Sequence, residues 1–205
     1  MRTQIYLRRG KEESLLRRHP WIFSGAIERV KSQGEVKEGE VVDVFTKSGE
    51  FIARGHYQIG SIAVRVLTFE EQEQIDQAWW NNRIAIAYDV RRTLALTDDE
   101  QTNCYRLVHG EGDNLPGLII DYYDGVCVMQ AHSVGMFRAK KQILDEIMDR
   151  FGNSATFSNE TETYSKGVWQ HIALATEDVD ACVKAVRDAG YEITMEPKDI
   201  VVACQ

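Results

Sequence analysis

A run of short alternating segments in the first 70 residues constrains the fold most. Apolar and polar residues alternate at 4–8 and 62–67, a strand hairpin is predicted from 41–45 and 50–53 around the turn at 47–49, and glycines stand at 34, 39, 49, 55 and 60. Short strands separated by glycine turns predict a compact β-barrel. One or two helical turns are predicted over 12–18, because Pro20 disfavours helix at His19.

The segment from Glu70 to Leu96 has helical rather than strand periodicity. Apolar residues recur there at spacings of four or seven, which predicts one helix with a single apolar face. The predicted face consists of Ile75, Trp79, Ile86, Val90 and Leu94. The arginines at 83, 91 and 92 lie off this face, so we expect them to be solvated.

The region from 105 to 151 predicts a small sheet followed by a helix. Strands are predicted at 105–108, 118–121 and 126–130, with Asp124-Gly125 as a tight turn between the last two. A helix is predicted over 137–151, with Ile143 and Ile147 on its buried side. The sequence therefore predicts the α+β class.

Charge is distributed unevenly along the chain. The formal net charge is −8, yet residues 1–31 hold eight basic and three acidic groups, a local balance of +5. A basic segment on an acidic protein is typical of a face that meets phosphates. An ordinary solvated surface explains the same charges, so composition leaves both interpretations open.

Cysteine spacing and hydropathy exclude several classes. Cys104, Cys127, Cys182 and Cys204 form no CxxC pair, so they are interpreted as buried thiols and not as zinc or redox ligands. No apolar run approaches the roughly 20 residues that span a bilayer. The basic N-terminus has no apolar segment behind it, so a cytoplasmic protein is expected.

The glycine-rich segment 109–117 is similar to the start of a dinucleotide-binding motif, but a strand and not a helix is predicted after it. Such a motif needs a helix N-terminus at the pyrophosphate, so we reject it here. His109, Glu111 and Asp113 could form an acid–base cluster. A hydrogen-bonded turn is the alternative.

Three motifs near the N-terminus and one in the middle resemble a known family. They are 19–27 (HPWIFSGAI), 39–44 (GEVVDV), 51–55 (FIARG) and 106–121 (RLVHGEGDNLPGLIID). Over residues 1–152 they resemble the PUA and central domains of bacterial 23S rRNA (cytosine-C5) methyltransferases. The resemblance implies RNA as the partner, 23S rRNA in particular. Candidate RNA contacts are Arg8, Arg9, Arg17, Arg18, His19 and Trp21, and a core position is the alternative for Trp21.

The sequence after Gly152 departs from that family. Its members continue into a domain that binds S-adenosylmethionine and carries a cysteine nucleophile after a proline. Here glycines follow only at 167 and 190, and no Pro-Cys motif is present. We therefore expect this chain to bind RNA through its N-terminal barrel, with no catalytic residues and no bound cofactor of its own.

Residues 163–205 resemble a partial module of the glyoxalase/bleomycin-resistance (vicinal oxygen chelate) family, whose modules have the order βαβββ. In that family the histidine of the first strand often ligates a metal, which makes His171 a candidate. A metal site needs further ligands that the segment lacks, so none is expected. A small metal-dependent enzyme and a fragment without function remain alternatives to RNA binding.

The resulting organisation has three parts. Residues 1–70 are assigned to a PUA-like β-barrel and 71–152 to a linker helix and a ββαβ-type α/β sandwich. Residues 153–205 are assigned to a polar linker or junction over 153–162 and a βαβ segment over 168–202. We expect that segment to complete or flank the second sheet, because an unpaired sheet edge favours aggregation.

Overall fold

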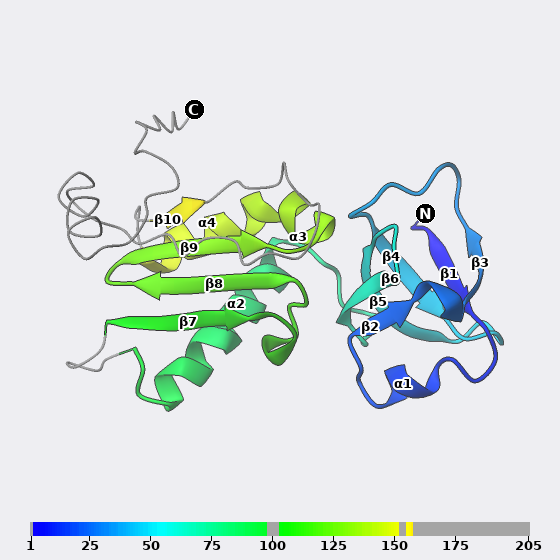
Figure 1. The fold of residues 1–205 in the computed structure, drawn as a ribbon, viewed down its shortest axis with the longest axis horizontal. Coiled ribbons are helices and arrows are strands. Elements are labelled where there is room, and N and C mark those ends of the chain that lie inside the picture. Colours follow the sequence, from blue (N-terminus) through cyan, green and yellow to red (C-terminus); the bar gives the residue numbers. More distant parts are fainter. Residues whose placement is uncertain (1, 98–102, 152–154, 158–205) are drawn as a thin grey trace, which may run out of the picture. The chain divides into compact units, whose positions relative to one another are not determined.

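The computed structural model describes residues 2–97, 103–151 and 155–157, and it has the expected α+β class. Six strands form the first sheet, which curls into a barrel (Figure 1). The strands are β1 Gln4–Leu7, β2 Trp21–Phe23, β3 Ile27–Lys31, β4 Val41–Phe45, β5 Phe51–Tyr57 and β6 Ile62–Thr68. Their order in the sheet is β2-β6-β5-β4-β1-β3, in which β1 and β4 are parallel and the other pairs antiparallel.

Alternation along the strands fills the barrel. On β1, Ile5 and Leu7 are fully buried while Tyr6 between them is half-buried, and β4 buries Val42 and Val44 in the same way. The short helix α1, Glu13–Leu16, inserts Leu15 into this core. The 3-10 turn η1, Ser24–Ala26, then leads into β3, a strand that the sequence reading did not identify.

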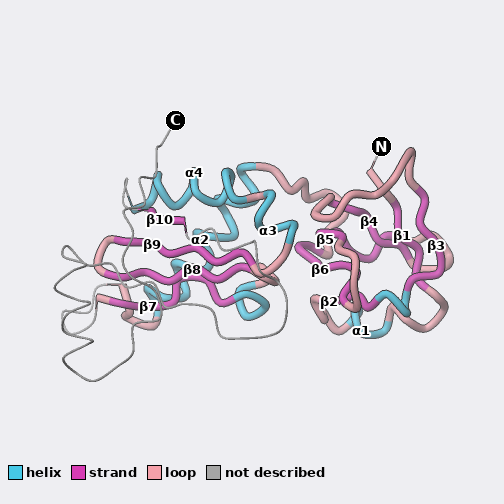
Figure 2. Tube along the Cα trace, turned by 45° about the horizontal axis from the view of Figure 1, so that its top comes forward, coloured by secondary structure: helices cyan, strands magenta, loops and turns pink. Residues whose placement is uncertain are grey.

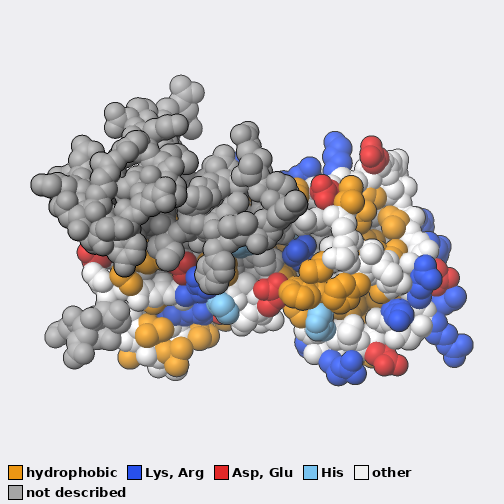
Figure 3. All heavy atoms as spheres, viewed as in Figure 1, with side chains coloured by type: hydrophobic (Ala, Val, Ile, Leu, Met, Phe, Trp, Pro, Cys, Tyr) orange, Lys and Arg blue, Asp and Glu red, His pale blue; other side chains and the backbone are white. Residues whose placement is uncertain are grey.

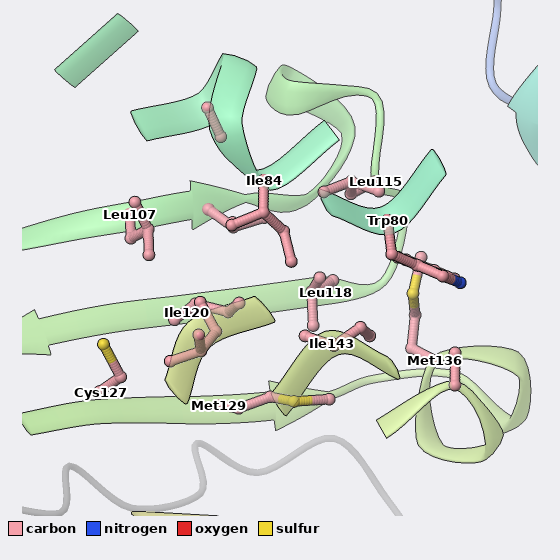
Figure 4. Packing of buried hydrophobic residues seen from close by; sticks show 14 of the residues in the cluster. Trp80, Ile84, Leu107, Leu115, Leu118, Ile120, Cys127, Met129, Met136 and Ile143 are labelled. Atoms are coloured by element: carbon pink, nitrogen blue, oxygen red, sulfur yellow. The ribbon is translucent and has the colours of Figure 1, made fainter. Parts of the chain in front are cut away.

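The second sheet has four strands in the order β10-β9-β8-β7 (Figure 2). They are β7 Cys104–His109, β8 Leu118–Tyr123, β9 Val126–Ala131 and β10 Ala155–Phe157. Helices α2 Gln77–Thr93, α3 Val134–Arg138 and α4 Lys140–Phe151 accompany the sheet. Apolar residues from the strands and helices meet in one core, where Ile84 and Ile143 approach Leu118 and Met129 (Figure 4). The Asp124-Gly125 turn is confirmed, with φ of 44° and 90°.

The interpretation of 153–162 as a linker is wrong at its centre. Residues 155–157 form β10, which pairs in parallel with β9 from Ala155↔Cys127 to Phe157↔Met129. A sheet edge presents unpaired backbone groups, and this short strand satisfies those of β9. Composition hid the strand because three residues carry too little alternation to be recognised.

The buried face of α2 also differs from the prediction. Trp79 is buried as expected, but Ile86 and Val90 are about half exposed and Leu94 is 64% exposed. The buried side instead consists of Trp79, Trp80, Ile84, Ala87 and Arg91. The helix begins at Gln77, where the Asp76 side chain accepts a hydrogen bond from the Trp79 backbone N–H. Residues 70–76 are therefore outside the helix.

Arg91 is buried, contrary to the expectation that it is solvated. Its guanidinium pairs with Asp113 at 2.5 Å and donates to the Arg106 carbonyl at 2.7 Å. Arg92, by contrast, is 62% exposed. Of the two cysteines that the structure describes, Cys104 is exposed and Cys127 is buried, so the buried-thiol interpretation is confirmed for Cys127 and wrong for Cys104. The predicted helix 137–151 is two helices, α3 and α4, separated at Ala139.

Several predictions lie outside the described residues. These are the βαβ segment 168–202, His171, Cys182 and Cys204. The division at residues 70 and 152 stays a prediction. Among the described helices, none is both long and apolar enough to cross a membrane.

Candidate nucleic-acid interface

A hollow of about 320 Å³ lies between α1 and β2. It forms because Leu15 anchors one side of α1 in the barrel core and Ile22 anchors β2 beside it, which leaves space between the two elements. Its lining combines polar, aromatic and backbone groups: Lys11, Ser14, Leu15, Trp21, Ile22, Phe23, Gly25 and Ala26. The hollow is thus small, partly apolar and bordered by a cation.

Aromatic side chains form one wall of this hollow. Trp21 and Phe23 lie on the same side of β2, with ring centroids 6.5 Å apart and planes at 90°. The His19 ring meets Trp21 edge-on at 5.8 Å, and its Nδ1 accepts a hydrogen bond from the Trp21 backbone N–H at 3.2 Å. Figure 3 shows apolar side chains gathered on the barrel around β2, with Lys and Arg side chains at their margin.

Trp21 is only half-buried, and its indole Nε1 donates to Glu111 Oε1 at 2.9 Å. The ring therefore lies at the surface of the barrel core, which is formed by aliphatic residues. A fixed, partly exposed indole offers a flat face for stacking. Glu111 was interpreted within an acid–base cluster or turn, and its contact with Trp21 is separated by 90 residues in sequence, so no local pattern could reveal it.

The four candidate arginines are all exposed, but they differ in their partners. Arg9 and Arg17 make no ion pair within the described part of the chain. Arg8 donates from Nε to the Ile27 carbonyl at 3.1 Å. Arg18 lies 3.4 Å from Glu70 and stacks over the Phe69 ring at 4.8 Å. Arg9 and Arg17 are consequently the cations most available to an anionic ligand.

The turn after α1 sets the position of these groups. Arg18 has φ of 63°, the left-handed region that non-glycine residues rarely adopt. Its backbone N–H donates to the Leu15 carbonyl, and that of His19 donates to the Ser14 carbonyl. These bonds end α1 and direct the chain into β2. Sequence reasoning named Trp21 and His19 but missed Phe23, although its place two residues after Trp21 on one strand puts it on the same side.

The 109–117 loop is a hydrogen-bonded turn, as the second interpretation proposed. Asp113 accepts from the His109 backbone N–H at 2.5 Å and pairs with Arg91, so both of its carboxylate oxygens are hydrogen-bonded within the protein. The 3-10 turn η2, Gly110–Asp113, leads into β8 and not into an α-helix. This loop therefore lacks the helix N-terminus that would meet a nucleotide phosphate.

Buried titratable groups lie outside the lining of the hollow. Burial, reinforced by the Arg65 guanidinium, lowers the pKa of His56 on β5 to about 4. Burial raises the pKa of Cys127 to about 11. In the part of the chain that the structure describes, no group of three or more His, Cys, Asp or Glu side chains could hold a metal ion.

Comparisons with known proteins agree with both resemblances. A PUA-like domain model matches residues 5–69. The chain is 32% identical over 199 residues to Ribosomal RNA large subunit methyltransferase I of Shigella boydii, covering 96% of this chain and 49% of that protein. It is 38% identical over 155 residues to the protein of the same name from Klebsiella pneumoniae, covering 75% and 38%. The chain thus spans half or less of the length of these relatives.

A solved structure shares the fold. A chain described as a SAM-dependent methyltransferase from Streptococcus mutans aligns with a TM-score of 0.62 over 75% of this chain and 40% of its own length. At 14% identity the likeness concerns the fold alone.

The Glyoxalase/Bleomycin resistance protein/Dioxygenase superfamily model matches residues 64–203, and it overlaps the region shared with the rRNA methyltransferases. The elements β6, α2, β7, β8 and β9 follow one another in the order β-α-β-β-β, which is the order of a glyoxalase module. In space, however, β6 pairs with β2 and β5 of the barrel. The chain therefore has the element order of a glyoxalase module over this region, but its β6 is paired within the barrel.

Proposed function

We propose that this chain binds structured RNA through its barrel. The chain carries a PUA-like domain over residues 5–69. It belongs to the Glyoxalase/Bleomycin resistance protein/Dioxygenase superfamily, whose model matches residues 64–203. The proposed ligand is large-subunit rRNA, because the curated relatives are named for that substrate. The proposed location is the cytoplasm.

The hollow between α1 and β2 is the observation that carries the proposal. RNA is recognised by stacking of unpaired bases on aromatic rings together with contacts to phosphates. Trp21 and Phe23 supply the rings, and Lys11 lines the same hollow. Arg9 and Arg17 supply cations that no carboxylate neutralises among the described residues.

Each proposed contact has a distinct task. The exposed arginines at 8, 9, 17 and 18 meet phosphates, and the His19 ring holds Trp21 and approaches a base or sugar. Because the Arg18 guanidinium is shared with Glu70, its contribution is smaller than that of Arg9 or Arg17. No step of methyl transfer is assigned to the described residues.

The test is RNA binding by the whole chain to large-subunit rRNA fragments at several salt concentrations. The slope of log affinity against log salt is negative, and each lost phosphate contact reduces its magnitude by roughly 0.7 to 0.9. Arg9→Ala and Arg17→Ala should each lower the affinity and make this slope less steep. Arg92→Ala is the matched control, since Arg92 is an exposed arginine on α2. A wild-type affinity independent of salt would contradict the proposal, as would equal effects of all three variants.

The superfamily match favours a second candidate function, a metal-dependent activity that involves His171. Metal binding to the folded state would raise the melting temperature. Zinc or nickel should then stabilise the chain, and His171→Ala should abolish the shift. An unchanged melting temperature in wild-type protein would remove this candidate.

A further inference from the structure

A row of side chains crosses four adjacent strands of the barrel, away from the lining of the hollow. The strand register places Tyr6 opposite Arg29 on one side and opposite Phe45 on the other, and it places Phe45 opposite Phe51. The row therefore runs over β3, β1, β4 and β5, which lie side by side in Figure 2. We call Arg29, Tyr6, Phe45 and Phe51 the aromatic row.

The rings of the aromatic row are in contact with one another. Tyr6 and Phe45 stack with centroids 5.4 Å apart and planes at 24°, and Phe45 meets Phe51 edge-on at 5.9 Å. The Arg29 guanidinium lies over the Tyr6 ring at 3.9 Å. A planar, delocalised group thus already stacks on this surface.

The aromatic row faces outward from the barrel. Ile5, Leu7 and Val44, its neighbours in sequence, are fully buried, whereas Tyr6 and Phe45 are half-buried. These rings do not fill the barrel core, because the buried residues of that core are aliphatic.

The adjacent row on the same side of these strands holds the segment after β6, and its Arg54 guanidinium also lies over the Phe51 ring of the aromatic row at 5.4 Å. Asp43 accepts from Arg54 Nε at 2.6 Å, and Arg54 also donates to the carbonyls of Glu71 and Glu73. The segment after β6 is therefore held against that row. No backbone contact of this kind to the aromatic row is found within the described residues.

Positive charge accompanies the rings. Arg29 and Lys31 are exposed on β3, and Lys47 follows β4. Lys47 pairs with Glu28 at 3.0 Å. Of these three cations, Arg29 and Lys31 are therefore the ones that an anion could approach. Aromatic rings with flanking cations on a sheet surface suit single-stranded nucleic acid, whose bases stack and whose phosphates pair with the cations.

We propose that the aromatic row is a second RNA subsite, which stacks unpaired nucleobases of a single-stranded segment. The subsite rests on the proposed function only in taking RNA as the ligand, since it shares no residue with the hollow between α1 and β2. Stacking discriminates little among bases, so the subsite binds single strands with little sequence preference.

The experiment measures binding of a short oligouridine to the whole chain at low salt, with an abasic oligomer of equal length as the second probe. Oligouridine should bind more tightly than the abasic oligomer, because both carry the phosphates but only one carries bases. Tyr6→Leu and Phe45→Leu should weaken oligouridine binding on the order of tenfold. Tyr6→Phe, which keeps the ring, is the matched control and should bind as wild type does.

Unfolding is followed for each variant, and photo-crosslinking of 4-thiouridine oligomers to the wild-type chain gives a readout that needs no substitution. Crosslinks to Tyr6 or Phe45 support the subsite. Equal binding of the two oligomers, or crosslinks confined to other segments, would overturn it. Arg9→Ala and Arg17→Ala should weaken binding of the rRNA fragment more than that of oligouridine. A failed subsite with salt-dependent rRNA binding would therefore leave the proposed function intact.

Discussion

The barrel and the second sheet place their aromatic residues in opposite ways. In the barrel, Trp21, Tyr6 and Phe45 lie at the surface, and the interior is aliphatic. In the second sheet, Trp79 and Trp80 are buried against the strands, and Tyr122 packs 5.4 Å from Phe151. A sheet covered by helices has a wide interior to fill, and large rings fill it. A small curled barrel closes over short side chains, which leaves these rings at its surface.

The arginines follow the same division. Arg91 in the second part is buried and paired with Asp113, whereas Arg9 and Arg17 on the barrel are exposed. A buried cation needs a fixed partner, so its loss affects folding. An exposed cation costs the fold little, so its loss affects binding. The difference predicts which substitutions act on stability and which on affinity.

The largest effect on stability is expected from Arg91→Ala. It leaves the Asp113 carboxylate, 9% exposed, without its partner, which costs about 3–5 kcal/mol. Arg92→Ala next to it removes an exposed pair with Asp89 and should cost less than about 1 kcal/mol. Denaturant unfolding of both variants measures the difference. Similar losses in both would show that the buried pair has no special role.

Ile84→Ala should be nearly as costly, at about 2–5 kcal/mol, because Ile84 is fully buried. Ile86→Ala on the same helix should change the unfolding free energy by about 0.5 kcal/mol or less, since Ile86 is 47% exposed. The pair locates the buried face of α2. A larger loss of unfolding free energy in Ile86→Ala than in Ile84→Ala would instead support the buried face predicted from the sequence.

His56 predicts a pH dependence that originates in the barrel. Its pKa of about 4 in the folded protein lies below the ordinary histidine pKa of 6.5, so the unfolded chain binds more protons between these values. Stability contributed by neutral His56 is complete above pH 6.5 and falls by roughly 3 kcal/mol as the pH drops to 4.

Unfolding measured across this window tests the assignment. His56→Leu removes the titrating ring and should reduce the dependence. An unchanged slope between pH 6.5 and 4 in that variant would assign the dependence to other groups.

The smallest effect on stability and a clear one on binding are expected from Trp21→Ala. Loss of the half-buried indole should cost roughly 1 kcal/mol of unfolding free energy. RNA affinity should fall by about five- to a hundredfold if a base stacks on this ring. Trp21→Phe keeps a stacking surface but loses the bond to Glu111, so it separates the two contributions. Normal RNA binding by Trp21→Ala would exclude the ring as a contact.

Sequence periodicity predicted those elements whose buried residues are the ones that the local apolar pattern indicates. The strands β4 and β6 and the turn at Asp124-Gly125 were predicted because alternation and turn residues are local signals. The face of α2 was not, because Trp80 and Ile84 are buried by partners far away in sequence, which no helical spacing encodes.

The candidate interface shows the same limit. Charge and the motif at 19–27 identified the arginines, His19 and Trp21 as candidates. The hollow itself depends on the packing of α1 beside β2, and the bond between Trp21 and Glu111 joins residues 90 positions apart. A single sequence contains no local signal for either.

The parallel pairing of β10 with β9 limits where the chain can be shortened. A protein cut at Phe151 would keep all of α4 but lose Ala155–Phe157, and β9 would then have no strand along its edge opposite β8 from Cys127 to Met129. Fragments prepared for crystallisation or for fusion to other proteins should therefore extend beyond residue 157. The boundary suggested by the helix alone would give a piece prone to self-association.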